Sequence, residues 1–170
     1  MLRCRRLAPA GRLCAMRRTS AICALFVALS ACQTAQAQVV PQRSIKGVHI
    51  GWYKSDVRAV LGAPDRIVRR KNEIVSETLT YDYGRTHVTF IDDVVFNVST
   101  TSRRERTSAG VRVGSSRRFV QQHVRGARCL VQYGRNHCYV GTWMPGRIIT
   151  EFLFGSTGRV KLISLGRVID

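Results

Sequence analysis

The sequence predicts an α+β fold of two tandem units that form one antiparallel sheet, with their helices packed on one face. Three observations lead to this prediction. The segment 47–51 (GVHIG) returns 63 positions later as 110–114 (GVRVG). Apolar residues at helical spacing follow each copy, and alternating apolar and polar residues follow each helix. We therefore expect each unit to be a helical part followed by a β-meander.

Residues 1–31 are expected to be a signal peptide. They hold six arginines, no acid, and an apolar run from Ala21 to Leu29 that is too short for a permanent membrane span. Met16 is a second candidate for the true start, because a start there would leave a compact signal.

Without residues 1–31 the formal net charge falls from +18 to +12. This charge favours anionic partners such as lipid headgroups, wall polymers or acidic protein faces, whereas export argues against nucleic acid.

Two cleavage sites compete after the apolar run. The segment 29–32 (LSAC) has the form of a lipobox, in which Cys32 would be acylated and anchor the chain to a membrane. The segment 35–37 (AQA) has the form of an ordinary signal cleavage site, which would make Gln38 the first residue. Either site predicts an exported protein of the cell envelope that faces the periplasm or the extracellular side. Gln33 is not the aspartate associated with inner-membrane retention, which favours the outer membrane.

The mature chain divides into a tether and a folded domain. Residues 32–45 are polar and lack periodicity, as is typical of a tether. The domain is expected over 46–170, with one unit at about 46–102 and the other at about 109–168. The segment 101–108 (TSRRERTS) separates the two units.

In the first unit, Val57, Val60 and Leu61 fall on one face of a predicted helix. Asp56 suits its first turn, and the Gly62-x-Pro64 sequence ends it. The rest of this unit is expected to be a three-stranded meander over 78–83, 87–91 and 94–99.

In the second unit, Ser116 is expected to cap a helix that Gly126 ends. Its apolar face is expected to hold Phe119, Val120, His123 and Val124, with His123 packed rather than acting as a ligand. The following strands are a cysteine-bearing hairpin, 148–154 and 160–165.

Cys129 and Cys138 are expected to form a disulfide. The segment 133–136 (YGRN) supplies a turn between them, so two facing hairpin strands would bring them to bonding distance. An oxidising compartment would preserve the bond. Two alternatives remain: free thiols, or a metal pair with His137, although three ligands are too few for a structural zinc site.

The pattern Ile50-Gly51, then Val57, then Leu61-Gly62-x-Pro64, before a meander rich in Tyr and Phe, resembles the SmpA/OmlA (BamE-like) small-lipoprotein family. The tandem copy is similar to the β-lactamase inhibitor protein (BLIP-like) arrangement. The resemblance covers about residues 46–168 and implies two helices and a three-stranded antiparallel sheet per unit. The second copy departs from it, because 124–127 (VRGA) replaces the Leu-Gly-x-Pro ending. A cysteine pair occurs only in the second unit, and no residue matches inhibitory contact loops.

The sequence shows no catalytic constellation, no metal site and no cofactor motif. None of the four histidines lies in a metal-binding spacing, and no nucleophile elbow or phosphate loop occurs. Asp92-Asp93 fits a tight turn better than a pair of catalytic carboxylates.

The candidate residues for binding a partner are aromatic, because Trp and Tyr dominate binding hot spots. The competing interpretation is that many of them pack in the core, since strands favour aromatic residues. An exposed Trp143 would indicate contact with a partner or with lipid. The candidates are Tyr81, Tyr83, Tyr133, Tyr139 and Trp143.

The sequence therefore predicts a non-enzymatic, exported envelope protein, anchored by lipid at Cys32, that binds a protein partner. The alternative is a soluble inhibitor of an envelope enzyme, and the weakest option is an enzyme of unknown type. The partner and the oligomeric state are left open.

Overall fold

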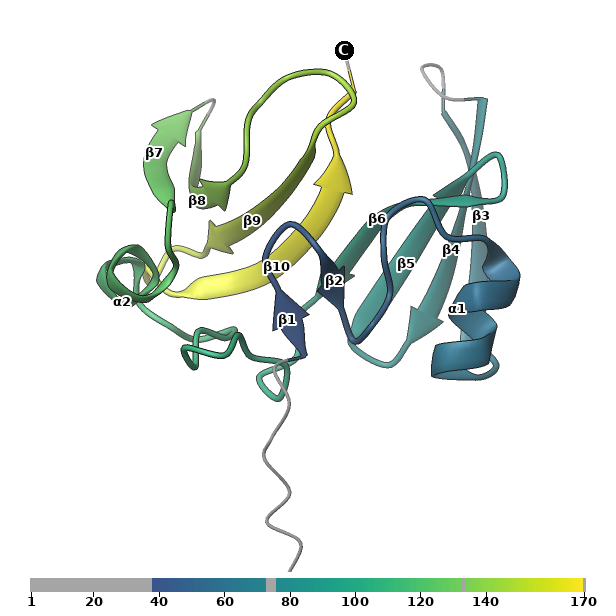
Figure 1. Cartoon of the computed structure of the whole chain (residues 1–170), viewed down its shortest axis with the longest axis horizontal. Helices are drawn as coiled ribbons and strands as arrows, with labels where there is room; N and C mark the ends of the chain where they lie inside the picture. Colours follow the sequence, from purple (N-terminus) through teal and green to yellow (C-terminus); the bar gives the residue numbers. More distant parts are fainter. Residues whose placement is uncertain (1–37, 73–75, 133, 170) are drawn as a thin grey trace, which may run out of the picture. The chain divides into compact units, whose positions relative to one another are not determined.

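The computed structural model describes residues 38–72, 76–132 and 134–169. In this part of the chain, one eight-stranded antiparallel sheet is accompanied by a two-stranded sheet and two short helices (Figure 1). In chain order the elements are β1 (Val39–Val40), β2 (Ser44–Ile45), α1 (Lys54–Leu61), β3 (Arg66–Asn72), β4 (Ser76–Tyr83), β5 (Thr86–Ile91), β6 (Val94–Thr100), α2 (Arg117–His123), β7 (Arg128–Gln132), β8 (Arg135–Val140), β9 (Ile148–Phe154) and β10 (Val160–Arg167).

The large sheet consists of two four-stranded meanders joined through their last strands. The strand order is β3-β4-β5-β6-β10-β9-β8-β7. At the central seam β6 pairs with β10, and Ser99 lies opposite Ser164. Figure 1 shows this seam in the middle, with α1 and α2 toward opposite ends of the sheet. The second half therefore repeats the strand order of the first, starting from the other edge.

The predicted fold class is wrong. Within the described residues the protein is mainly β, and each unit has one short helix and four strands, whereas two helices per unit and, in the first unit, a three-stranded meander were expected. The first unit gains β3, which reads RIVRRKN and whose charge hides the alternation that marks a strand. Within each unit, no described helix stands before α1 or α2 respectively, because the chain there makes tight turns at glycines with positive φ.

The repeated segments 47–51 and 110–114 share the backbone conformation of their glycines. Gly47 and Gly110 have φ of 78° and 80°, and Gly51 and Gly114 have φ of 90° and 97°. Glycine adopts these values without the steric cost that a Cβ imposes. The similarity in sequence therefore reflects a loop that is built twice.

Each copy of this loop is bound to the last strand of its own unit. The Gly51 N–H donates to the Val95 carbonyl at 2.9 Å, and the Gly114 N–H donates to the Val160 carbonyl at 2.8 Å. The valine that follows the first glycine of each loop is fully buried. The loop thus holds the start of each helix against the sheet.

Helix α1 begins and ends where the sequence predicts. The Asp56 carboxylate accepts a hydrogen bond from the Tyr53 N–H at 2.9 Å, and the chain leaves the helix at Gly62 with φ of 80°. Val57 is fully buried, but Val60 is 51% exposed, so its place on the buried face was predicted wrongly. Val57 is the one residue of the predicted stripe that α1 buries.

Helix α2 confirms the predicted cap, because the Ser116 hydroxyl accepts a hydrogen bond from the Phe119 N–H at 3.2 Å. Val120 and Val124 are buried. His123 is exposed, and its ring stacks on Phe119 with the centroids 3.9 Å apart.

The prediction of a tether is wrong for residues 38–45, which fold into the β1–β2 hairpin. Val39 and Ile45 are buried in the core, and the Gln42 N–H donates to Thr150 Oγ1 at 2.7 Å. Val39, Val40 and Ile45 show neither helical nor strand periodicity in this otherwise polar segment, so the sequence offered no sign of this hairpin.

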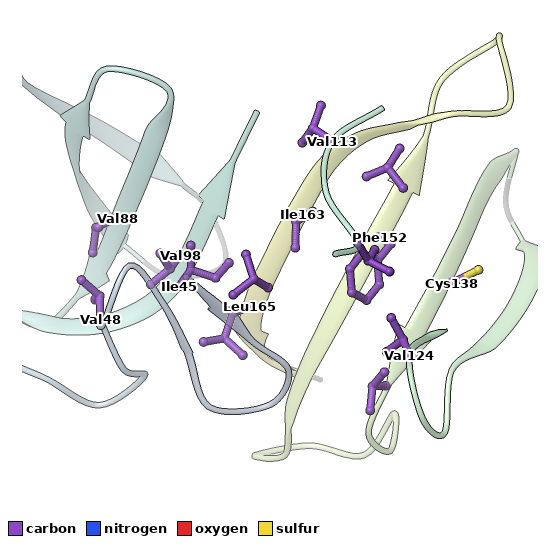
Figure 2. Close-up of a cluster of buried hydrophobic side chains, with 14 of the residues drawn as sticks. Ile45, Val48, Val88, Val98, Val113, Val124, Cys138, Phe152, Ile163 and Leu165 are labelled. Atoms are coloured by element: carbon purple, nitrogen blue, oxygen red, sulfur yellow. The ribbon is translucent and has the colours of Figure 1, made fainter. Parts of the chain in front are cut away.

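A single hydrophobic core extends under both halves of the sheet (Figure 2). It brings together residues of the hairpin, the repeated loops, both helices and the sheet. Its fully buried members include Ile45, Val48, Val57, Val88, Phe90, Val98, Val111, Val120, Phe152, Ile163 and Leu165. The two units therefore share one core.

Candidate protein-binding surface

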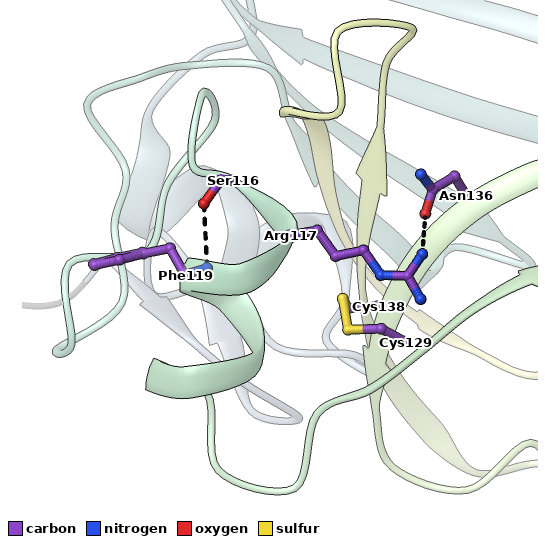
Figure 3. Close-up of a disulfide and its surroundings, with 6 residues drawn as sticks. All are labelled: Ser116, Arg117, Phe119, Cys129, Asn136 and Cys138. Atoms are coloured by element: carbon purple, nitrogen blue, oxygen red, sulfur yellow. Dashed lines mark hydrogen bonds between the residues drawn. A yellow bond between two sulfur atoms is a disulfide. The ribbon is translucent and has the colours of Figure 1, made fainter.

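The predicted disulfide between Cys129 and Cys138 is confirmed. The two residues are direct cross-strand partners on β7 and β8, and their Cα atoms lie 3.9 Å apart. Figure 3 shows the bond beside α2, from which Arg117 donates to Asn136 Oδ1 at 3.1 Å. Such a bond persists in oxidising compartments, which fits the predicted export.

The two aromatic candidates on β4 lie in different surroundings. Tyr81 is 4% exposed and packs edge-on against Phe90, so burial removes it from any binding surface. Tyr83 is half-buried, and its hydroxyl donates to the Gly62 carbonyl at 3.3 Å. Burial, followed by the nearby Tyr81, raises the pKa of the Tyr83 phenol above its ordinary value of 10.0. Tyr83 therefore stays neutral, and its hydroxyl binds the residue at which α1 ends.

Trp143 and Tyr139 meet on the second half of the sheet. Their ring centroids are 5.7 Å apart in an edge-to-face arrangement, and the His137 ring lies 6.2 Å from that of Trp143. Tyr139 is buried, whereas Trp143 is 46% exposed and Met144 beside it is 54% exposed. Trp143 thus covers Tyr139 with part of its surface and presents the rest to solvent.

The loop that carries Trp143 joins β8 to β9 and is fixed at both ends. At its start, Gly141 has φ of 112°, and a Cβ there would lie 2.8 Å from the Ile148 carbonyl oxygen. At its end, the Gly146 N–H donates to the Val168 carbonyl at 2.9 Å. A cavity of about 430 Å³ lies beside the loop and is lined by Gln42, Thr142, Met144, Gly146, Arg147 and Ile148. We call Trp143, Met144 and this cavity the Trp143 surface.

A row of polar residues crosses all eight strands, each member being the direct cross-strand partner of the next. Strand alternation places this polar row on the face opposite the buried Tyr81, Val88 and Phe152. From one edge to the other it consists of Arg66, Asp82, His87, Ser99, Ser164, Glu151, Tyr139 and Arg128. Sequence reasoning missed the row, because only strand register reveals it.

Asp82, one of the two acids in the polar row, is bound by side chains from both neighbouring strands. Its carboxylate lies 2.6 Å from His87 Nδ1 and accepts from Arg66 Nε at 2.8 Å. Burial acts to raise the pKa of the Asp82 carboxyl, but the hydrogen bonds from His87 and Arg66 and the charges of both residues outweigh it. The pKa of Asp82 therefore lies below its ordinary value of 3.8, and the carboxylate is charged at neutral pH.

The second half has a similar acid–histidine pair. In the first half the acid is on β4 and the histidine on β5, whereas in the second half the histidine is on β8 and the acid on β9. His137 Nδ1 bonds to Glu151 on β9, and Arg135 Nη2 donates to the other oxygen of Glu151 at 3.3 Å. His137 is buried, and no described group bonds to its Nε2. The rings of Tyr139 and Trp143 lie 5.9 and 6.2 Å from that of His137, so this buried group adjoins the Trp143 surface.

Neither acid–histidine pair forms a complete catalytic set in the described residues. A histidine held by a carboxylate can act as a general base, and Ser99 lies beside His87 in the row. Among the described residues, however, no hydrogen bond joins these two side chains. Asp92 and Asp93 have φ of 49° and 68° and form the β5–β6 turn. No group of three His, Cys, Asp or Glu residues in the described part of the chain is placed to hold a metal ion.

Two predicted residues, Cys32 and Tyr133, lie outside the described residues. Lipidation and the contribution of Tyr133 therefore remain predictions. Among the described helices, none is long and apolar enough to cross a membrane.

Fold and surface together define a mainly β protein with a duplicated meander and an exposed aromatic loop. No family model and no curated protein matches the chain. The chain is similar to the crystal structure of a DUF4309 family protein from Bacillus subtilis, with 19% identity, 78% of this chain and 89% of that chain covered, and a TM-score of 0.46.

Two further structures are similar over 69% of this chain and 44% of their own. One is an extracellular protein containing an SCP domain from Bacillus anthracis, with 11% identity and a TM-score of 0.46. The other is a cysteine-rich secretory protein from Staphylococcus aureus, with 9% identity and a TM-score of 0.42. At these values the likenesses support no conclusion about function. None of the three is described as an SmpA/OmlA lipoprotein or a β-lactamase inhibitor, so the expected family stays a prediction.

Proposed function

We propose that this chain is an exported binding module of the bacterial envelope, without catalytic activity, that docks a protein partner on the Trp143 surface. The observation that carries the proposal is the half-exposed Trp143 in a loop fixed at both ends. An exposed Trp next to an exposed Met is unusual on a surface without a partner. Anchoring through an acylated Cys32 is part of the proposal.

The Trp143 surface has the properties of a binding hot spot. Trp143 rests edge-on against Tyr139, so little side-chain freedom is lost when a partner covers it. The neighbouring cavity offers space for a side chain of the partner. The exposed Arg147 lines this cavity, and the whole mature chain is basic, which favours a partner with an acidic rim.

The test is quantitative capture of partners from a crosslinked envelope extract with three forms of the protein. Trp143→Ala should lower recovery of the specific partner by about ten-fold or more, as expected for a hot-spot residue. Tyr53→Ala is the matched control, because Tyr53 is an aromatic residue that is 61% exposed elsewhere on the surface. Recovery that falls equally for both variants, or for neither, contradicts the proposed surface.

Further measurements test the anchor and the non-catalytic role. An acylated Cys32 at the start of the mature chain, seen by mass spectrometry, supports the lipid anchor, whereas a mature chain beginning at Gln38 excludes it. If the captured partner is an envelope enzyme whose activity falls on binding, the role is inhibition.

A further inference from the structure

A basic cavity of about 590 Å³ lies where the second repeated loop meets the start of α2. The exposed arginines Arg103, Arg112 and Arg159 line it, together with Ser115, Ser116 and Phe119. In the described part of the chain, no Asp or Glu oxygen lies within 4.0 Å of these three guanidinium groups. The cavity therefore holds positive charge that the described residues do not neutralise.

Two of the guanidinium groups converge on a single backbone position. Arg159 Nη1 donates to the Gly114 carbonyl at 3.0 Å, and Arg103 Nε lies 4.0 Å from the place that a Cβ would take on Gly114. Like charges brought this close repel each other, and the repulsion would be relieved by a bound anion.

The first repeat has different side chains at the equivalent positions. At an offset of 63 residues, Trp52 corresponds to Ser115, and His49 corresponds to Arg112. In the first repeat these two rings pack together with their centroids 4.7 Å apart, and Trp52 is half-buried against the core. Small serines in the second repeat leave space where the first repeat has an indole.

The second repeat is also more positively charged than the first around this position. Asp56, the acid at the start of α1, corresponds to Phe119. The bridge that joins Tyr53 to Val94 in the first repeat corresponds to the bridge that joins Ser116 to Arg159 in the second. The second repeat therefore loses an acid and gains two arginines around a cavity on an otherwise repeated backbone.

We infer that this cavity binds a phosphate group of a ligand. Three guanidinium groups supply the planar, paired donors that match phosphate oxygens. The Ser115 and Ser116 hydroxyls at the rim can add further hydrogen bonds, and Phe119 gives the lining an apolar part. The site lies on residues that the Trp143 surface does not use, so it goes beyond the proposed function and does not depend on it.

The test uses full-length mature protein that carries Cys32→Ser, so that an acyl chain cannot itself attach the protein to vesicles. Inorganic phosphate is titrated at low ionic strength while the backbone amide signals of Gly114, Ser115 and Ser116 are followed by NMR. In parallel, the protein is sedimented with phosphatidylglycerol vesicles and with phosphatidylcholine vesicles. Signal changes with inorganic phosphate identify a site for free phosphate groups, whereas binding to phosphatidylglycerol alone identifies a lipid headgroup as the source.

Two variants localise the effect. The Arg103→Gln/Arg112→Gln variant should weaken binding by about ten-fold or more, because it removes two charge-assisted contacts. Ser115→Trp should also weaken binding, because it fills the cavity as Trp52 fills the first repeat and leaves the charge unchanged. Arg43→Gln/Arg125→Gln is the matched control, since both residues are exposed arginines outside the cavity lining.

Binding that survives Arg103→Gln/Arg112→Gln, or that falls as much in the control, overturns the site and leaves a general charge effect. Absence of binding to both inorganic phosphate and phosphatidylglycerol overturns it as well. Thermal unfolding of each variant confirms that it is folded. If Ser115→Trp does not fold, the arginine pair and its control decide the result.

Discussion

Asp82 is the residue on which the edge of the first half depends, because it binds side chains from β3 and β5 at once. Asp82→Asn should lower the free energy of unfolding at pH 7 by about 1–3 kcal/mol, as for a buried group whose charged hydrogen bonds are weakened. Asp93→Asn is the matched control, since Asp93 is 72% exposed in its ion pair with Lys54 and should change stability by about 1 kcal/mol or less. Urea unfolding measures both variants.

The difference in unfolding free energy between the wild type and Asp82→Asn should change with pH in a defined direction. The pKa of Asp82 is lower in the folded protein than the ordinary value of 3.8, so its stabilising contribution is present above that pH. The contribution disappears as the pH falls through the lower folded pKa. The gap between the wild type and Asp82→Asn should therefore narrow below pH 3.8. A gap that stays constant at lower pH contradicts this role.

Gly141 sets the position of the loop that carries Trp143. Gly141→Ala would combine a positive φ with a Cβ only 2.8 Å from a backbone oxygen, so we expect the free energy of unfolding to fall by about 2–4 kcal/mol. Gly146→Ala in the same loop separates the cost of the positive φ from the cost of the close contact. It has φ of 78° and open space around the Cβ position, and should cost about 1 kcal/mol. If thermal unfolding shows the same loss of stability for Gly141→Ala and Gly146→Ala, the close contact at Gly141 does not contribute.

Individual residues were predictable where a local rule decides. The cap at Ser116 and the end of α1 at Gly62 follow from hydrogen bonding and backbone sterics within a few positions. Tyr81, the polar row and the pair of His137 with Glu151 depend on which strands become neighbours. No local pattern contains that information, so the sequence could not reveal these sites.

At the scale of elements, the disulfide closes the hairpin of β7 and β8 at one edge of the sheet. Cys129→Ala/Cys138→Ala should lower the free energy of unfolding by about 2–3 kcal/mol, mainly because the unfolded chain is released from the closed loop. Hydrogen exchange should quicken most in β7, which pairs with one strand only. Faster exchange spread equally over all strands, or an unchanged stability, would contradict a role confined to this hairpin.

Elements were predictable when their residues alternate or repeat cleanly. Strands β5, β6, β9 and β10 and both helices lie near their predicted positions. Strand β3 was missed because arginines and a lysine occupy it at an edge, where solvated charges are tolerated on both faces. The β1–β2 hairpin was missed because contacts with residues far along the chain hold it in place.

At the scale of the molecule, the two halves should not fold separately. A fragment of residues 38–102 would leave β6 without β10 and expose Val98, which is fully buried in the whole chain. We expect this fragment to show no cooperative unfolding by circular dichroism, whereas residues 38–170 unfold in one transition. A cooperative transition in the fragment would show that each unit has a core of its own.

The whole architecture was predictable only in part. The 63-residue repeat indicated duplication, and the structure repeats loop, helix and meander in the same order. Two helices per unit were implied by the family resemblance, but in the described residues a loop stands where the second helix was expected, and the charged β3 of the first unit lacks the alternation that would have predicted it. How the halves join depends on the pairing of β6 with β10, which no repeated motif encodes.

Among the strands of the described residues, β3 and β7 lie at the two edges of the eight-stranded sheet, and each pairs with a strand on one side only. Such edges can join to edges of other molecules and start aggregation, and both here carry an exposed apolar residue, Ile67 and Val131. The β3 edge also carries Arg66, Arg69, Arg70 and Lys71, and the β7 edge carries Arg128. Two molecules that approach edge to edge would bring these cations together and repel each other. The basic side chains at these edges thus oppose association of the sheet with further copies of the chain.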